Sequence, residues 1–508
     1  MKGAVAAGHP VTVAAACDVL QAGGNAFDAA IAAVFASCVA EPVLSSLGGG
    51  GFLLARGPGQ PERVFDFFAQ TPINTDQKSS QDFYPVVVDF GHAQQEFHIG
   101  LGACATPGCV SGLFSVHKEL ASMSMRELVQ PAVAAARDGV KVTELQGFIF
   151  SLVAPIYTTP GAGRIFNGTD SSDIAKAGEM LRLPEFADIM EILAIEGPTL
   201  FYRGEIASSI VELCNSGGGH LRREDLASYK TEMRRPLNVD YRDARILTNP
   251  PPSNGGVLVA FGLRLLSELT MDGFAHNSYE HLRRLIDVMR VSTRARTEHM
   301  IGQGPAPLLD KHLHEQYRAQ VYGHPQFTRG TTHISVADEK GNVAAVTISN
   351  GEGCGHVVPG TGIMLNNMLG EEDLNPDGFG VWPGNQRMGS MMAPTIILAP
   401  EDRVIVTGSG GSNRIRTALL QVLSNLIDFD CGLTDAVSNP RIHIEDKVLN
   451  IEGGIEEQVV ARLTSQFPEH RCFKDLNLFF GGAHSVLRQG HRFSGCGDPR
   501  RGGVYQVV

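Results

Sequence analysis

The spacing of apolar residues alternates along the chain between helical and strand-like periods. Helices are predicted at residues 10–23, 25–39, 110–139, 173–195 (with a break at Pro184), 203–215, 256–266, 280–300 and 414–427. Strands are predicted at residues 52–56, 63–68, 86–90, 331–337, 343–349, 395–399 and 403–407. This alternation suggests two β-sheets packed between helical layers.

The most informative stretch is a predicted hairpin at residues 331–349, with the sequence TTHISVADEKGNVAAVTIS. Its two arms are rich in strand-forming residues, and Gly341 supplies the positive φ that the turn between them needs. The first arm starts at Thr331, directly after Gly330. Threonine is a good strand former, so this position by itself requires no function.

A second interpretation gives Thr331 a chemical role. If the bond between Gly330 and Thr331 is cut, Thr331 becomes an N-terminal residue whose own α-amine lies beside its hydroxyl. An α-amine titrates near about pH 8, which suits a general base at neutral pH. Thr331 is then nucleophile and base in one residue, and the base does not exist before the cut.

Composition narrows the functional classes. Of the 508 residues, 43% are hydrophobic and 19% are charged, as in ordinary globular proteins, and the formal charge of −12 argues against a nucleic-acid partner. The nine cysteines are scattered without a Cys-x-x-Cys pair, which favours reduced thiols. The apolar run at residues 29–40 is too short to span a membrane, so we expect a buried helix there and no membrane partner.

Metal sites and targeting signals are not evident. Residues 373–378 copy the first half of a calcium-binding loop, but the twelfth position is Gly384 rather than glutamate, and the histidines show no ligand spacing, so we expect no metal and no cofactor. Cys354, between two glycines, is either a reactive thiol or an inert one. Residues 1–10 lack a secretory signal, which predicts a cytoplasmic protein, or a periplasmic or secreted one if a leader has been removed.

A series of short motifs resembles one protein family. In chain order they are GGNAFDAA (residues 23–30), LGGGGF (47–52), ATPG (105–108), EDLASY (224–229), PPPSNGG (250–256), TTH (331–333), LNN (365–367), APTI (393–396), GSGG (408–411) and NPRIH (439–443). In this order, and over nearly the whole chain, they are similar to the γ-glutamyltransferase (γ-glutamyltranspeptidase) family of N-terminal-nucleophile hydrolases.

The resemblance implies an α+β fold, an αββα sandwich of two stacked, mainly antiparallel sheets between helical layers. It implies a precursor that cuts itself between Gly330 and Thr331 into a large subunit, residues 1–330, and a small subunit, residues 331–508, which together form one composite domain. The expected assembly is a heterodimer of these subunits, or a dimer of such heterodimers.

The implied function is cleavage of γ-glutamyl or related amide bonds, as in glutathione-type compounds, with release to water or to an amine. Thr331 is the implied nucleophile, and Ser349 stands where the family has a threonine that bonds it. Gly411 and Ser412 match the pair whose backbone N–H groups bind the oxyanion, with Gly410 as the alternative if the alignment shifts by one. Such donors contribute roughly 3 kcal/mol each to the transition state.

Substrate-binding positions follow from the same resemblance. Asn350 matches an asparagine that binds substrate, in a loop two residues shorter than in many relatives. Glu371 matches a carboxylate that holds the α-amine of the substrate; the alternative is one more acid in a solvated loop. Ser390 matches a contact to the substrate carboxylate, and Met391 stands where a second serine is common.

Phe68 is the main departure from the family pattern. Relatives that bind γ-glutamyl groups have an arginine here, after Asp-Phe, whose bidentate fork clamps the α-carboxylate. Met368 stands where glutamine is common, so the acyl pocket is expected to be apolar. Two alternatives are therefore kept: an acylase or biosynthetic hydrolase acting on a non-glutamyl amide, and, from another class, a binding protein that has lost catalysis.

Overall fold

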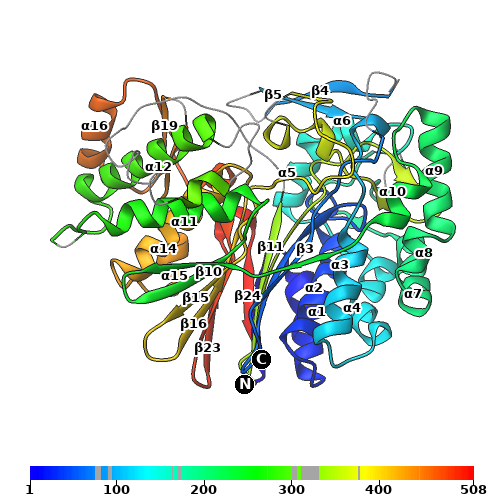
Figure 1. The fold of residues 1–508 in the computed structure, drawn as a ribbon, viewed down its shortest axis with the longest axis horizontal. Coiled ribbons are helices and arrows are strands. Elements are labelled where there is room, and N and C mark those ends of the chain that lie inside the picture. Colours follow the sequence, from blue (N-terminus) through cyan, green and yellow to red (C-terminus); the bar gives the residue numbers. More distant parts are fainter. Residues whose placement is uncertain are drawn as a thin grey trace.

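The computed structural model describes residues 1–74, 82–89, 94–162, 164–169, 173–271, 273–299, 306–310, 331–375, 378–445 and 447–508. Figure 1 shows helices on both outer sides and two sheets between them. Gly330, the first residue of the predicted scissile bond, lies outside the described residues. Thr331, the second residue of that bond, is described.

Two antiparallel sheets form the centre of the molecule. The first has the order β24 (Val504–Val507), β1 (Gly3–Ala7), β11 (Thr332–Asp338), β12 (Val343–Ser349), β2 (Gly50–Arg56), β3 (Arg63–Phe67) and β8 (Glu232–Arg234). The second has the order β23 (Arg492–Cys496), β22 (Ser485–Gln489), β16 (Arg403–Thr407), β15 (Thr395–Ala399), β10 (Ala244–Thr248) and β9 (Leu237–Tyr241). Each sheet contains strands from both predicted subunits, so neither subunit carries a complete sheet.

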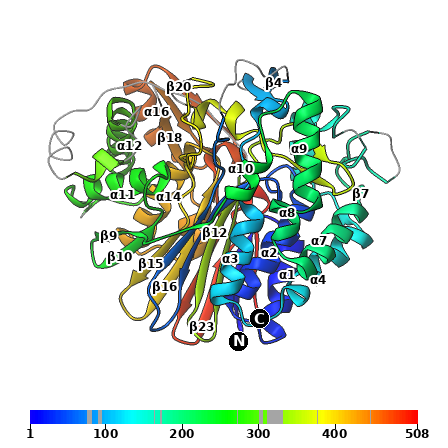
Figure 2. The ribbon, with the colours of Figure 1, turned by 45° about the vertical axis from the view of Figure 1, so that its right-hand side comes forward.

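Helices cover the outer face of each sheet (Figures 1 and 2). On the first sheet lie α1 (Pro10–Gln21), α2 (Ala26–Ala40) and α3 (Cys109–Leu120), backed by α4 (Met125–Asp138), α7 (Pro184–Glu196), α8 (Thr199–Tyr202) and α9 (Glu205–Gly217). On the second lie α11 (Asn254–Ser267), α14 (Arg414–Ile427) and α15 (Leu433–Ser438), and α12 (Tyr279–His299) packs on α11. Each sheet has a hydrophobic core against its helices, and a third core fills the space between the sheets. The predicted αββα sandwich is confirmed.

Helix α2 shows how the sequence builds this packing. Asn25 caps its N-terminus and exchanges hydrogen bonds with Asp28, while every residue from Ala26 to Ala40 is buried. Its many alanines let it pack closely on α1, β11 and β12. This confirms the predicted buried helix, and Glu41 follows as its C-terminal cap.

Most predicted elements are confirmed, one is wrong and one is divided. Residues 110–139, predicted as one helical stretch, form α3 and α4, because Ser124 caps the start of a second helix. Strands β15 and β16 and helix α14 have the predicted bounds, and Gly341 has a φ of 88° in the turn between β11 and β12. The predicted helix at residues 173–195 begins only at Pro184, which occupies its first turn. Proline disfavours helical backbone in the residue before it, so residues 173–183 form turns and the short strand β7 (Met180–Leu181) instead.

Smaller elements connect these layers. They are β4 (Tyr84–Asp89), β5 (Gln94–Ile99), β6 (Val140–Lys141), α5 (Glu144–Leu152), α6 (Ala154–Tyr157), α10 (Arg223–Ser228), β13 (Val357–Val358), β14 (Ile363–Met364), η5 (Glu372–Leu374), β17 (Ser409–Gly410), β18 (Ile442–Glu445), β19 (Val448–Ile451), α16 (Glu457–Gln466), β20 (His470–Cys472), β21 (Gly482–Ala483) and η7 (Pro499–Arg501). Across the described ranges, no helix has the length and apolar character that crossing a bilayer requires.

Candidate active site

Thr331 lies directly before the first residue of β11, in a row of positions that crosses the first sheet. The register of β11 and β12, extended by one step, places Thr331 opposite Ser349, and Ser349 pairs in turn with Gly50 of β2. A Cβ atom on Gly50 would lie 3.0 Å from the Cα atom of Phe68, so glycine lets the chain at Phe68 approach the sheet. Three predicted site residues, Thr331, Ser349 and Phe68, therefore lie along one row.

This row faces the second sheet. Side chains alternate along a strand, so Thr331 shares a face of β11 with His333. The ring of His333 has Nδ1 2.7 Å from the Oγ1 of Thr347 and Nε2 3.0 Å from the Oγ of Ser335. Burial lowers the pKa of His333 well below its ordinary value, so the ring is neutral. It links two strands and is not a candidate for the general base.

The glycine-rich turn before α14 packs on the backbone of Thr331. A Cβ atom on Gly410 would lie 2.1 Å from the carbonyl oxygen of Thr331, so only glycine fits there. Gly411 has a φ of 114° and Ser412 a φ of 50°, both in the left-handed region. The turn leads into the N-terminus of α14, where backbone N–H groups and the helix dipole favour negative charge. The predicted oxyanion pair therefore lies beside the predicted nucleophile.

Asp373 in η5 holds this turn in place. Its carboxylate accepts hydrogen bonds from the Oγ of Ser412, at 2.6 Å, and from the Nδ2 of Asn413, at 3.2 Å. These contacts offset the strain of a serine at positive φ. In the sequence Asp373 is visible only as part of an incomplete calcium loop, and nothing there indicates that η5 packs against the turn before α14.

The loop after β12 presents a buried amide. The Oγ of Ser349 accepts a hydrogen bond from the backbone N–H of Gly351, at 2.9 Å. The side chain of Asn350 is fully buried, and neither its nitrogen nor its oxygen has a hydrogen-bond partner within the described part of the chain. A buried amide without partners costs free energy unless a ligand satisfies it, which fits the predicted role of Asn350.

Glu371 lies close to the same loop. A Cβ atom on Gly351 would lie 2.3 Å from the Oε1 of Glu371, and Glu371 is only 4% exposed. The alternative of a solvated acid is therefore wrong. A carboxylate buried beside Asn350 is suited to bind a cationic group such as an amine.

Ser390 is held by the proline-rich loop before α11. Its carbonyl oxygen accepts hydrogen bonds from the Oγ of Ser253, at 3.0 Å, and from the backbone N–H of Asn254, at 2.7 Å. Its own Oγ accepts from the backbone N–H of Met392, at 3.1 Å. The PPPSNGG motif thus positions the segment that carries Ser390.

Met391 is not brought together with the other predicted substrate contacts. Its side chain belongs to the core between the second sheet and its helices, whereas Met388 and Met392 belong to the core between the sheets. The alternation of side chains along this extended segment separates them. Met392 is thus a better candidate than Met391 for contact with the acyl group.

Phe68 belongs to an apolar cluster between the sheets. It is 1% exposed, stacks on Phe52 with ring centroids 5.6 Å apart, and shares its core with Met368 and Met392. The nearby Arg387 does not replace the missing arginine, because its guanidinium donates to the carbonyl oxygens of residues 66, 68 and 230 and to the hydroxyl of Tyr229. The expected apolar environment of Phe68 and Met368 is confirmed.

The GGGG and LNN motifs meet behind this site. A Cβ atom on Gly49 would lie 2.3 Å from the carbonyl oxygen of Ser349. Asn366 donates to the carbonyl oxygen of Gly48, at 2.8 Å, and accepts from the backbone N–H of Ala105, at 3.1 Å. The glycine run therefore serves close backbone packing, and the hydrogen bonds of Asn366 lock it to the ATPG motif.

Glu41 is a buried acid that sequence analysis did not single out. Its Oε1 accepts a hydrogen bond from the Oγ1 of Thr332, at 3.1 Å, and its Oε2 accepts one from Thr12, at 3.3 Å. Burial raises the pKa of Glu41 from 4.5 to about 7, although the two hydroxyl donors and the charge of Arg501 oppose that shift. Its only signal in the sequence was an acid directly after a long apolar helix.

This raised pKa predicts a pH-dependent stability. Between pH 4.5 and about 7 the folded protein keeps a proton that the unfolded chain releases, so the free energy of unfolding falls as pH rises through this window. In Glu41→Gln this slope is expected to disappear, and the difference in unfolding free energy between the two proteins should change by on the order of 3 kcal/mol. Chemical denaturation of both proteins at several pH values measures this difference. If their free energies of unfolding change with pH in parallel, the pKa of Glu41 is not raised.

The cysteines are the other potentially reactive side chains, and they are buried or lie outside the candidate site. All nine cysteines are free thiols, and Cys354 is fully buried. This favours an inert Cys354 and confirms the expected reduced thiols. In the residues that the structure describes, no group of three or more His, Cys, Asp or Glu side chains could hold a metal ion.

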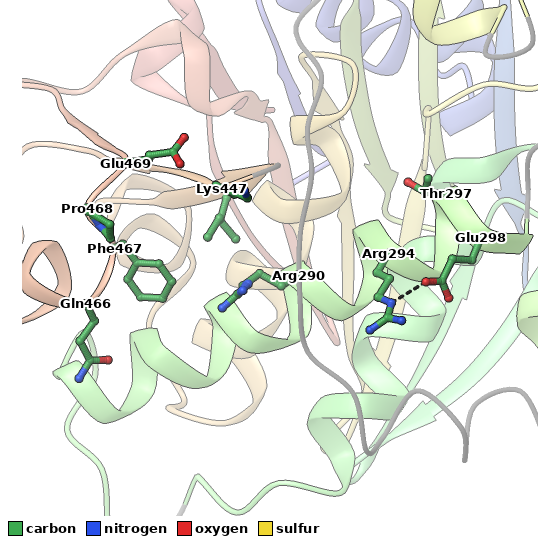
Figure 3. A pocket seen from close by; sticks show the side chains of 10 residues that line it. Arg290, Arg294, Thr297, Glu298, Lys447, Gln466, Phe467, Pro468 and Glu469 are labelled. Carbon is green, nitrogen blue, oxygen red and sulfur yellow. Dashed lines mark hydrogen bonds and ion pairs between the residues drawn. The ribbon is translucent and has the colours of Figure 1, made fainter.

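A separate pocket lies between α12, the β18–β19 hairpin and the end of α16 (Figure 3). Its volume is about 660 Å³. Its lining residues are Arg290, Arg294, Thr297, Glu298, Ile444, Lys447, Gln466, Phe467, Pro468 and Glu469. The Nε of Arg294 pairs with Glu298 at 2.6 Å, as the dashed line shows. None of the site residues described above lines this pocket.

Comparison with known proteins gives one family over almost the whole chain. The family profile described as Gamma-glutamyltranspeptidase matches residues 12–508. The glutathione hydrolase proenzyme of Escherichia coli (strain K12) is 30% identical over 485 residues, which covers 87% of this chain and 81% of that protein. The Acylase ACY 1 proenzyme of Pseudomonas sp. (strain V22) is 29% identical over 489 residues, which covers 92% of this chain and 86% of that protein.

A solved structure supports the same fold. The cephalosporin acylase from Bacillus halodurans superposes with a TM-score of 0.86 at 24% identity, covering 99% of this chain and 95% of that one. At this level of identity the likeness establishes the fold.

Proposed function

The chain belongs to the gamma-glutamyltranspeptidase family, and on this basis we propose that it is a threonine amidohydrolase that becomes active when the bond before Thr331 is cut. The observation that carries this proposal is the packing of Gly410 on the carbonyl of Thr331, which puts an oxyanion loop next to the proposed nucleophile. Residues 1–330 then form the large subunit and residues 331–508 the small one. Since both supply strands to each sheet, the subunits stay together as one domain.

The first reaction is the cut itself. The hydroxyl of Thr331 attacks the carbonyl carbon of Gly330, the peptide nitrogen leaves as the α-amine of Thr331, and water hydrolyses the resulting ester. The products are a carboxylate on Gly330 and a free amine on Thr331. That amine is the base for the second reaction.

The second reaction uses a small amide as substrate. The α-amine accepts the hydroxyl proton of Thr331 while the oxygen attacks the amide carbonyl, and the N–H groups of Gly411 and Ser412 stabilise the negative charge on the carbonyl oxygen. The leaving amine takes up a proton, and an ester to Thr331 remains. Water releases the acyl group, or an amine accepts it.

The acyl group of the first candidate substrate is γ-glutamyl or a close relative. In this proposal Glu371 binds its α-amine, and the amide of Asn350 and the hydroxyl of Ser390 are further polar contacts; the burial of all three side chains supports these roles. A glutathione hydrolase and an acylase are both among the relatives, so the family name alone does not select the acyl group.

A second candidate, an acylase for a non-glutamyl amide, is favoured by one observation. Phe68 occupies the position of the family's carboxylate-binding arginine and lies in an apolar cluster with Phe52 and Met368. An apolar cluster is stabilised by burying hydrocarbon, but it does not offset the free-energy cost of desolvating a carboxylate. An aliphatic or aromatic acyl chain suits it better than a free carboxylate does.

A panel of chromogenic amides tests both candidates. We expect wild-type protein to cleave aliphatic or aromatic acyl amides about tenfold or more faster than the γ-glutamyl amide, since a hydrophobic pocket discriminates by about 10- to 200-fold. Phe68→Arg should move the ratio of kcat/KM toward γ-glutamyl. Preference of wild-type protein for γ-glutamyl would reject the second candidate and keep the first. No turnover of any amide by cut protein would reject both.

A further inference from the structure

Arg501, at the end of η7, lies against the proposed nucleophile and the oxyanion loop. Its Nη1 lies 3.5 Å from the carbonyl oxygen of Thr331. Cβ atoms on Gly410 and Gly411 would lie 3.4 Å from its Nη1 and 3.3 Å from its Nη2, and a Cβ atom on Gly482 would lie 2.5 Å from its Cδ. Three glycines thus make room for one buried guanidinium.

Glu41 reaches the next residue from the opposite face of the first sheet. Thr331 faces the second sheet, so Thr332 faces the helices, where its hydroxyl donates to Glu41. A Cβ atom on Gly8 would lie 2.4 Å from the Oε1 of Glu41 and 3.2 Å from the Oγ1 of Thr332, so this contact also depends on a glycine. Thr332 is the first residue of β11, and Thr331 precedes the strand.

The charges of these two buried side chains are coupled. Both are less than 9% exposed; burial raises the pKa of Glu41 and lowers that of Arg501, and the charge of each side chain opposes the shift of the other. The negative charges of Asp498 and Glu352 also favour the charged form of Arg501, whereas the positive charge of Arg441 opposes it. A buried charge costs much free energy without compensation, so the three acids offset part of the cost of burying Arg501.

We propose that Arg501 and Glu41 are positioning residues for Thr331, the guanidinium holding its carbonyl against the oxyanion loop and the carboxyl holding Thr332 from behind. This inference rests on the proposed function. Thr331 needs such positioning, because a cut before Thr331 turns the nucleophile into a chain end. Chain ends fray unless they are tied down, and a catalytic group must be held to within about 0.5 Å.

The pair makes the proposal testable by a double-mutant cycle. The variants of the cycle are Glu41→Gln, Arg501→Met and the two combined. Thr332→Val removes the hydroxyl that links Glu41 to the strand. Arg501→Lys is included in case Arg501→Met does not fold. The control is Asp28→Asn, which removes another buried carboxylate of α2 that accepts hydrogen bonds from Ser122 and Met123 far along the helix from Glu41. The readouts are the fraction of chain cut with time on a denaturing gel, and kcat and KM of cut protein with the best amide of the panel.

We expect Glu41→Gln, Thr332→Val and Arg501→Met to lower kcat and the rate of cutting by up to about 100-fold with little change in KM, as for a misplaced reacting group. Glu41→Gln should show these lower rates at neutral pH although it remains folded. Arg501→Lys should lose less in kcat and in the rate of cutting than Arg501→Met. The double variant should lose less than the product of the single losses, because neither charge is then left alone. Asp28→Asn should lower the melting temperature and leave kcat unchanged.

Two results would overturn the inference: wild-type rates in Glu41→Gln and in the Arg501 variants, or single losses that simply multiply in the double variant. Failure of the proposed function looks different, because wild-type protein would then remain uncut or Thr331 would prove dispensable.

Discussion

Thr331→Ala is expected to remain a single polypeptide and to lose at least about 10⁴-fold in amide turnover, as when the nucleophile of a catalytic unit is removed. The reason is that one residue supplies both the attacking oxygen and, after the cut, the amine that accepts its proton. Wild-type protein should migrate as two fragments, of about two-thirds and one-third of the chain. A denaturing gel, intact mass and an amide assay measure all three outcomes.

Thr331→Ser is the matched control for this experiment. Serine keeps the hydroxyl and the α-amine, so it should still be cut and should retain measurable turnover. If Thr331→Ala is found as two fragments, or still cleaves the best amide, then Thr331 is neither the site of processing nor the nucleophile.

Gly410→Ala is expected to fold but to lose about 10²- to 10³-fold in kcat, the effect of removing one oxyanion donor. Its Cβ atom would lie 2.1 Å from the carbonyl oxygen of Thr331 and 3.4 Å from the Nη1 of Arg501. The close contact is with backbone, so the turn that carries Gly411 and Ser412 and the backbone at Thr331 must move apart. The measurement is kcat of material that has been cut, together with the rate of cutting.

Gly432→Ala is a suitable control, because the nearest atom to its Cβ is the Oδ2 of Asp435, at 3.9 Å, and its φ is −57°. It should keep wild-type kcat. Equal activity of Gly410→Ala and Gly432→Ala would show that the turn does not need to touch Thr331, and the oxyanion assignment would have to move elsewhere.

Local patterns in the sequence predicted the elements well where each element stabilises itself. The hairpin around Gly341 and helix α14 follow from period and turn chemistry that lie within a few residues. The helix predicted at residues 173–195 failed at Pro184, where the same local chemistry, read as a break inside a helix, was in fact its start. The alternation of helices and strands indicated two sheets between helical layers, and the resemblance of ordered motifs to a family identified this arrangement as an αββα sandwich.

The candidate site was predicted only in part for the same physical reason. Thr331, Gly411 and Ser412 could be chosen from motifs, because their chemistry depends on residue type and on a turn. Asp373, Glu41 and Arg501 were missed, because each acts through a contact with a residue far away along the chain, and no periodicity encodes such contacts. Asp373 contacts Ser412, 39 positions away, Glu41 contacts Thr332, 291 positions away, and Arg501 contacts Thr331, 170 positions away. Met391 was chosen from its place in a motif. Side chains alternate along its extended segment, however, so the side chain of Met391 belongs to the core between the second sheet and its helices.

The amino-acid sequence by itself determined the choice of Thr331 as the proposed reacting group, the glycines that give the turns their backbone angles, and the hydrophobic periods that build two sheets and their helices. The tertiary structure alone decided which charges meet at Thr331: it places an arginine from the last ten residues against the carbonyl of Thr331 and an acid from the end of α2 against the hydroxyl of Thr332. The reason is that burial and coupling of charge arise only when distant segments share a low-dielectric core.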